Sequence, residues 1–113
     1  MHEMSIAESI VQIAEDAAAR EGSSRVKTVL VEIGALAGVE IEALRFAWDA
    51  VTREGSAAGA TLDISRTLGQ AWCLTCARTV EIPALYEPCP SCGGFQVQVT
   101  AGTEMRVKEI EVD

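Results

Sequence analysis

Two Cys-x-x-Cys motifs constrain the fold of this chain more than any other feature of its sequence. Cys73 and Cys76 form the first motif, Cys89 and Cys92 form the second, and twelve residues separate them. Each motif can turn two sulfurs toward one ion, and two such loops complete the tetrahedron of thiolates that Zn²⁺ accepts. Gly93 permits the positive φ that such a turn often needs after its second cysteine. Because protein sulfurs fill all four positions, the motifs predict a structural zinc site rather than a catalytic one.

Two other chemistries use the same kind of motif. A pair of redox dithiols is one, but no thioredoxin-like βαβ pattern surrounds either motif. A rubredoxin-like iron centre is the other, because residues 89–93 resemble one of its loops. The first motif, however, is followed by Ala77 where that loop has glycine. Zinc is therefore the metal we expect.

The start of the chain and its hydropathy predict a reduced, cytoplasmic protein. Glu3 and Glu8 stand where a secretory signal would carry Lys or Arg. No apolar stretch approaches the roughly 20 residues that a membrane-spanning helix needs, so we expect no membrane partner. In the cytoplasm thiols stay reduced, which favours metal binding by the cysteines over disulfides.

Hydrophobic periodicity predicts an α+β fold. Helical spacing covers residues 4–21, which include Ile13 on the apolar face and Ser5 with Glu8 as a capping box, and residues 40–54. Alternation predicts strands over residues 25–34, 60–68 and 105–112. The simplest architecture packs two helices on a three-stranded sheet and inserts a zinc-ribbon module with four cysteine ligands. We expect one domain from residues 1–68 plus 102–113, a zinc-binding domain from 69–101, and Trp48 and Trp72 as core anchors.

The net charge limits the range of partners. At −8, the chain gains no counterion-release affinity for phosphate backbones, so nucleic acid is not an expected partner. Plain solubility explains such a charge, and an acidic surface also suits a basic protein or a divalent cation.

The N-terminus offers a second metal site of a different kind. His2, the one histidine, follows Met1, so the amine, the His2 amide and the imidazole lie within one short stretch. The amine and that amide close a five-membered ring on a metal, and imidazole Nδ1 closes a six-membered ring. The amide or carboxylate of Glu3 can fill the fourth place. Planar nitrogen coordination favours Ni(II) or Cu(II) over zinc. A frayed terminus without function is the alternative.

The same residues resemble a known family. The opening MHEMSI, the strand that ends in VEIG at Gly34, the spacing of the paired cysteine motifs and the segment GTEMR at residues 102–106 are similar to the HypA family of nickel metallochaperones. These features extend over essentially the whole chain.

The resemblance implies a function in delivery rather than catalysis. Met1, His2 and Glu3 would bind nickel as transient cargo, and Glu40 occupies the place of an acidic nickel ligand in some family members. The four cysteines would hold structural zinc. Implied partners are a GTPase of hydrogenase maturation and the precursor of the [NiFe]-hydrogenase large subunit, and a homodimer is left open.

Two other functional classes are alternatives. A zinc ribbon can act as a nucleic-acid or protein interaction module, but the net charge argues against nucleic acid. An enzyme has little support, because the sequence has one histidine, no nucleophile–base motif and no Gly-rich phosphate loop. We therefore expect a non-enzymatic binding protein.

Overall fold

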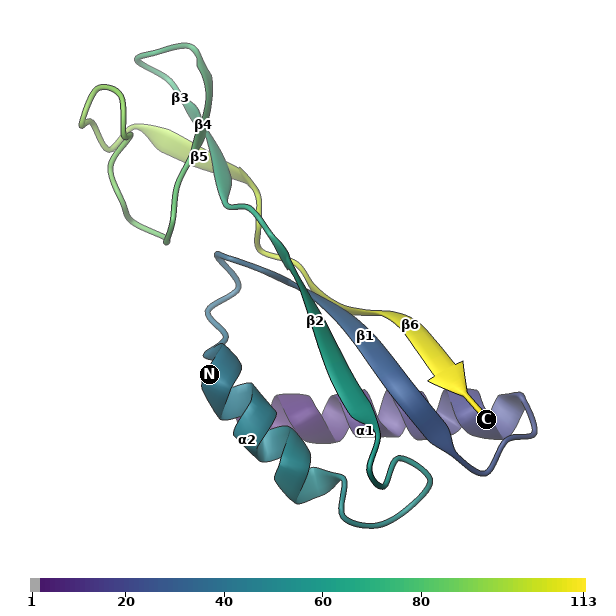
Figure 1. The fold of residues 1–113 in the computed structure, drawn as a ribbon. Coiled ribbons are helices and arrows are strands. Elements are labelled where there is room, and N and C mark those ends of the chain that lie inside the picture. Colours follow the sequence, from purple (N-terminus) through teal and green to yellow (C-terminus); the bar gives the residue numbers. More distant parts are fainter. Residues whose placement is uncertain (1–2) are drawn as a thin grey trace. The chain divides into compact units, whose positions relative to one another are not determined.

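The computed structural model describes residues 3–113, and it confirms the predicted α+β class (Figure 1). The elements are α1 Glu3–Arg20, β1 Val26–Gly34, α2 Ile41–Val51, β2 Thr61–Thr67, β3 Gln70–Cys73, β4 Arg78–Glu81, β5 Val97–Ala101 and β6 Met105–Val112. In this part of the chain, no helix has both the length and the apolar character that crossing a membrane requires.

The chain divides into two compact units. The first, which we call the helical unit, comprises the residues up to Val31 together with Val39–Ser65 and Arg106–Asp113. The second, the cysteine unit, comprises Glu32–Gly38 and Arg66–Met105. The strand order is β2-β1-β6 in one three-stranded sheet and β4-β3-β5 in the other.

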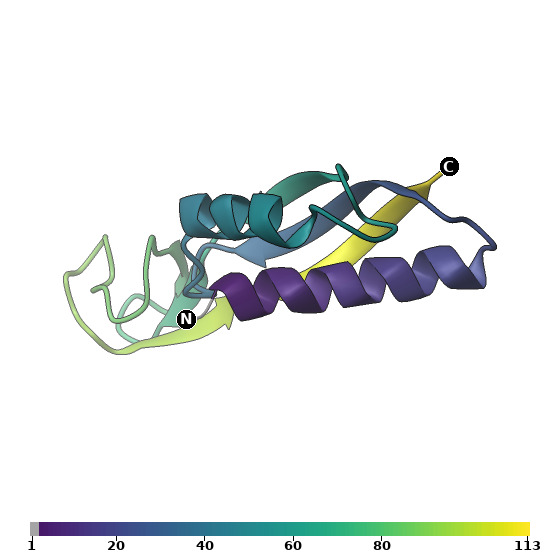
Figure 2. The same ribbon diagram turned by 90° about the horizontal axis from the view of Figure 1, so that it is seen from below.

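In the helical unit, both helices cover one face of the sheet β2-β1-β6 (Figure 2). Val29 and Val31 on β1 are buried beneath them, as period-2 alternation requires. The buried residues of α1 lie on one face of the helix: Ile6, Ile10, Ala14 and Ala18 recur every four residues, and Ala7 lies three before Ile10. On α2, Leu44 and Trp48 are buried, which confirms the prediction for Trp48.

Three local predictions are wrong. Trp72 is 39% exposed, because it alternates along β3 with the buried Ala71 and Cys73 and so lies on the opposite face of that strand. Ser5 does not begin a helix, since α1 already begins at Glu3 and Ser5 lies within it. Ile13 is 47% exposed, because the buried stripe of α1 continues through Ala14 instead.

The cysteine unit has a much smaller core. Strand β3 pairs antiparallel with β4 and with β5, and the buried cluster beneath them is Leu36, Ala71, Cys73, Val80, Ile82 and Cys89. Two of these six residues are cysteines of the paired motifs. The core of this unit is therefore partly built from its candidate metal ligands.

A close backbone crossing within the cysteine unit explains two of the sequence motifs. A Cβ at Gly34, the glycine of VEIG, would clash with the carbonyl oxygen of Gly102. The side chain of Glu104 accepts hydrogen bonds from Thr67 Oγ1 at 2.7 Å and from Gly102 N at 3.1 Å. The glycine thus allows the VEIG and GTEMR segments to approach, and the carboxylate of GTEMR binds Thr67 at the end of β2.

Candidate metal sites

The four cysteine sulfurs converge on one point in the cysteine unit. All four Sγ atoms lie within 4.8 Å of one another, with Cys73 to Cys92 at 3.7 Å and Cys76 to Cys89 at 3.9 Å. A tetrahedral ion with metal–sulfur bonds of about 2.3 Å, as in zinc sites, requires sulfurs about 3.8 Å apart. A disulfide would require about 2.05 Å. The spacing therefore fits a four-thiolate zinc site, and all four cysteines are free thiols.

The two motifs fold into the same local turn. Ala77 N donates to Cys73 O at 2.9 Å, and Gly93 N donates to Cys89 O at 2.8 Å. The residue after each second cysteine is left-handed, with φ 52° at Ala77 and 75° at Gly93. The structure confirms the predicted role of Gly93, and it shows that Ala77 takes the same conformation despite its Cβ.

Backbone amides in both turns point at the sulfurs. Cys76 N donates to Cys73 Sγ at 3.4 Å, and Ser91 N donates to Cys89 Sγ at 3.4 Å. Amide donors stabilise a thiolate, and those of Cys92 and Ser91 lower the pKa of Cys89 to about 6. Hydrogen bonding to Cys73 and burial raise the pKa of Cys76 to about 12. Without a cation, the cluster therefore retains protons that a bound metal would displace.

Sequence reasoning missed one contact between the two turns. The guanidinium of Arg78, two residues after the first motif, donates to Ser91 Oγ inside the second motif. The only signal in the sequence is a basic residue beside one motif and a hydroxyl within the other, and neither predicts the pairing. This bond links the two cysteine turns outside the sulfur cluster.

The predicted nickel ligands are divided between described and undescribed residues. Met1 and His2 lie outside residues 3–113, whereas Glu3 and Glu40 lie within them. Glu3 Oε2 accepts a hydrogen bond from Glu40 N at 3.2 Å, which joins the start of α1 to the start of α2. Glu40 is the N-cap of α2, and its Oε1 accepts from Glu42 N at 3.2 Å. The structure therefore brings together the two acidic residues of the predicted set.

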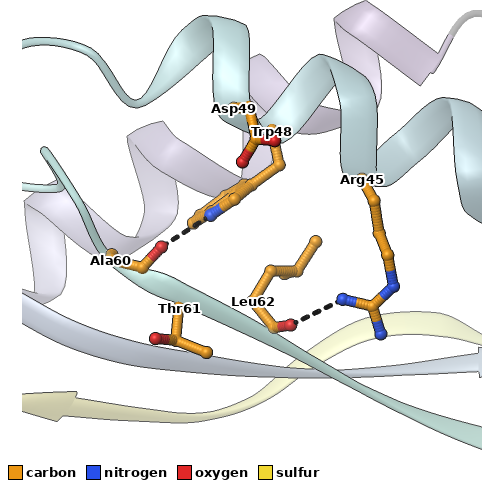
Figure 3. Close-up of a pocket in the computed structure, with 6 residues that line it drawn as sticks. All are labelled: Arg45, Trp48, Asp49, Ala60, Thr61 and Leu62. Carbon is orange, nitrogen blue, oxygen red and sulfur yellow. Dashed lines mark hydrogen bonds between the residues drawn. The ribbon is translucent and has the colours of Figure 1, made fainter.

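The other hollows of the helical unit have no comparable ligand set. One pocket of about 360 Å³ lies between α2 and β2 and includes Arg45, Trp48 and Asp49 (Figure 3). Trp48 Nε1 donates to Ala60 O at 2.8 Å, and Arg45 donates to Leu62 O at 3.1 Å. These two pocket side chains therefore already use their donors in hydrogen bonds to the backbone. Among residues 3–113, the four cysteines are the one close group of three or more potential metal ligands.

Comparison with known proteins places this geometry in a family. A family model described as "Hydrogenase/urease nickel incorporation, metallochaperone, hypA" matches residues 1–112. Hydrogenase maturation factors HypA of Albidiferax ferrireducens and Dechloromonas aromatica are each 55% identical to this chain over 113 residues, with full coverage of both chains.

Solved structures show the same fold. The solution structure of the Ni metallochaperone HypA from Helicobacter pylori has a TM-score of 0.66 at 26% identity, covering 99% of this chain and 97% of that one. A second solution structure of a HypA protein has a TM-score of 0.69 at 27% identity, covering 99% and 96%.

Proposed function

This chain belongs to the HypA family of hydrogenase and urease nickel-incorporation metallochaperones, and on that premise we propose that it binds Ni(II) at its N-terminus and delivers it for [NiFe]-hydrogenase maturation. The observation that carries the proposal is the family match over residues 1–112, which includes the MHE sequence at the chain start. The proposed nickel ligands are Met1, His2 and Glu3, with Glu40 as a further acidic ligand.

The start of a helix suits amide coordination. The first four amide N–H groups of a helix have no carbonyl partner within that helix. Helix α1 begins at Glu3, so the Glu3 amide is one of these groups. A nickel ion that replaces the proton of this amide would therefore break no hydrogen bond within α1. Planar coordination by amine, amide and imidazole nitrogens then favours Ni(II) over zinc.

The contact between Glu3 and Glu40 supports a shared acidic environment for the cation. The Glu3 carboxylate is held by the Glu40 amide, and the Glu40 carboxylate caps α2 through one oxygen. A carboxylate that accepts hydrogen bonds can still bind a metal, because its two oxygens offer about four lone-pair sites. Two carboxylates at adjoining helix starts also lower the electrostatic cost of bringing a dication there.

Zinc is the resident metal in this proposal. Cys73, Cys76, Cys89 and Cys92 would hold it, and the fit of the sulfur spacing to a tetrahedral ion supports this assignment. When bound, the ion supplies structural cross-linking and no open coordination site. The protein residues then keep the ribbon of the cysteine unit folded.

Delivery requires a partner that takes the ion. The family implies a GTPase of hydrogenase maturation and the precursor of the hydrogenase large subunit, or the corresponding urease system. We propose that the chain acts in the cytoplasm as a carrier without catalytic activity, and that any homodimer leaves the N-terminus accessible. The net charge of −8 favours protein partners over nucleic acid.

Nickel titration tests the proposal. Ni(II) is added to the zinc-loaded wild type and to His2→Ala, and the absorbance of a planar nitrogen complex is followed. We expect His2→Ala to lose the nickel complex while its zinc content and far-UV circular dichroism stay unchanged. Equal nickel affinity in the two proteins would refute the N-terminal site.

Two further variants separate charge from structure at Glu3. Glu3→Gln keeps an oxygen that can accept the bond from Glu40 N, whereas Glu3→Ala removes it. If the carboxylate binds nickel, both variants weaken binding. If Glu3 only positions the start of α1, Glu3→Gln retains the wild-type affinity and Glu3→Ala does not. N-terminal acetylation of the wild type, which removes the amine ligand, should abolish planar binding.

A further inference from the structure

The edge strands of the two sheets differ in how they are protected. Exposed strand edges invite pairing with other chains, and proteins guard them with charges, proline or covering side chains. Strand β6 carries four charged residues, and β4 is four residues long with a charge at each end. Side chains of α2 donate hydrogen bonds to the carbonyl of Leu62 in β2 and to that of Ala60 just before this strand. Strand β5, with the sequence VQVTA, has no charged residue and no proline.

The backbone of β5 presents hydrogen-bonding groups at its outer edge. Leu74 N donates to Gln96 O, and Trp72 lies opposite Gln98, so the peptide groups of Gln96 and Gln98 face β3. Peptide groups alternate in direction along an antiparallel strand. Those of Val97 and Val99 therefore face away from β3, and no strand lies beyond them among residues 3–113.

An apolar pocket adjoins this edge within the cysteine unit. It has a volume of about 280 Å³, and its lining is Ile82, Leu85, Tyr86, Glu87, Phe95, Val97 and Val99. Tyr86 and Phe95 are 92% and 71% exposed. Val97 and Val99 thus offer their side chains to the pocket and their peptide groups to the outer edge, which is the arrangement that strand addition uses.

Tyr86 is held in an uncommon conformation. Its φ is 68°, in the left-handed region that bulky residues rarely adopt. Its side chain gains almost no burial in return, since it is almost fully exposed at the pocket. An exposed aromatic ring on a strained residue beside an unprotected strand edge is typical of a binding surface rather than of a core.

The charge around the pocket indicates the kind of partner. Between Arg78 and Arg106 the sequence contains no Lys, Arg or His, and its charged residues are Glu81, Glu87 and Glu104. Glu87 lines the pocket itself. We propose that the outer edge of β5 and this pocket dock an extended segment of a partner protein, which adds a strand, inserts an apolar side chain and places a basic side chain near Glu87.

This inference goes beyond nickel delivery. The site shares no residue with the proposed nickel ligands, and the experiment that tests it contains no nickel. Its failure would therefore leave the N-terminal proposal standing, and equal nickel affinity of the wild type and His2→Ala, which would refute the N-terminal site, would leave the docking site standing.

A peptide titration followed by NMR tests the site. The probe is the capped peptide Ser-Val-Ser-Leu-Ser-Lys-Ser, which places its valine, leucine and lysine on one face of a strand. It is added to the ¹⁵N-labelled, zinc-loaded full chain. We expect saturable shifts of the Val97 and Val99 amides and of residues 82–87. Methylation of the valine and leucine amide nitrogens should weaken binding at least tenfold, and glutamate in place of lysine at least threefold.

Matched variants control for the fold. Phe95→Ala should weaken peptide binding at least threefold, whereas Phe46→Ala, which removes a similarly exposed ring from α2, should leave it unchanged. Equal binding of the methylated peptide, shifts confined to other residues, or no saturable shift at millimolar peptide would overturn the proposal. Pairing of β5 with a second copy of the chain, seen as concentration-dependent sedimentation and shifts at Val97 and Val99 without peptide, would also overturn it.

Discussion

The helical unit and the cysteine unit are built on different sources of stability. The helical unit buries apolar stripes from an 18-residue and an 11-residue helix against strands of one sheet. The cysteine unit has strands of four or five residues and a core of six buried side chains, two of them sulfur ligands. Small cores of this kind depend on a metal or disulfides. We therefore expect one unit to fold by apolar burial and the other to need a bound ion.

This difference suits the two kinds of metal site that we propose for this small chain. A structural ion must be retained, because its removal exposes a core that is too small to persist. A cargo ion must leave, and a site with few buried contacts would release it readily. From this contrast between the two units we predict effects that range from large to small.

Removal of zinc should have the largest effect. Structural zinc contributes about 10–16 kcal/mol in small zinc-finger peptides at neutral pH, so the cysteine unit should unfold without it. We expect a chelator with a reductant to abolish the hydrogen-exchange protection of β3, β4 and β5, while α1 and α2 keep most of their circular dichroism. Added zinc should restore the protection. Unfolding of both units on zinc removal would show that the stability of the helical unit also depends on the ion.

Truncation of a core side chain in the helical unit should have the second-largest effect. Leu44 is fully buried, and Leu44→Ala should destabilise the helical unit by about 2–5 kcal/mol, measured by urea unfolding. Its zinc content should not change. Phe46→Ala on the same helix is the control, since a ring that is 77% exposed should cost no more than about 0.5 kcal/mol. Loss of zinc from Leu44→Ala would show that the two units depend on each other.

Acidification should weaken zinc binding by the cysteine unit. The pKa of Cys89 is lowered from 9.0 to about 6, so its stabilising contribution is complete above pH 9 and is lost as pH falls toward 6. The pKa of Cys76 is raised to about 12, so zinc must displace its proton near neutral pH. We expect zinc affinity to fall about tenfold or more from pH 7.5 to 5.5 by chelator competition. A pH-independent affinity would contradict this prediction.

The smallest effect should follow from the link between the cysteine turns. Arg78→Ala removes the guanidinium that donates to Ser91 Oγ, an exposed hydrogen bond whose net contribution is about 0.5–1 kcal/mol. Zinc should dissociate up to about fivefold faster, as measured by transfer to a chromogenic chelator. Arg53→Ala in the helical unit should leave the rate unchanged. A much larger increase in the zinc dissociation rate of Arg78→Ala would mean that Arg78 fixes the geometry of the sulfurs directly.

Much of the fold was predictable because its signals are local. The helical periods of α1 and α2 and the alternation of β1, β2 and β6 lie within single segments, so their positions could be read along the chain. Trp72 and Ile13 could not be assigned in the same way. Each is apolar, but its exposure depends on which face another element covers. The nickel ligands at Met1 and His2 stay a prediction from the sequence and the family.

The sequence by itself determined the spacing of the four cysteines, the order of α1, β1, α2, β2 and β6, and the family, because residue identity and spacing encode these directly. Only the tertiary structure decided that Glu3 meets the Glu40 amide, that Arg78 reaches Ser91 and that β5 presents an unprotected edge beside an apolar pocket. Each of these depends on residues brought together from different segments or on the neighbours that a strand has or lacks. Such relations arise from packing in three dimensions, which no local pattern specifies.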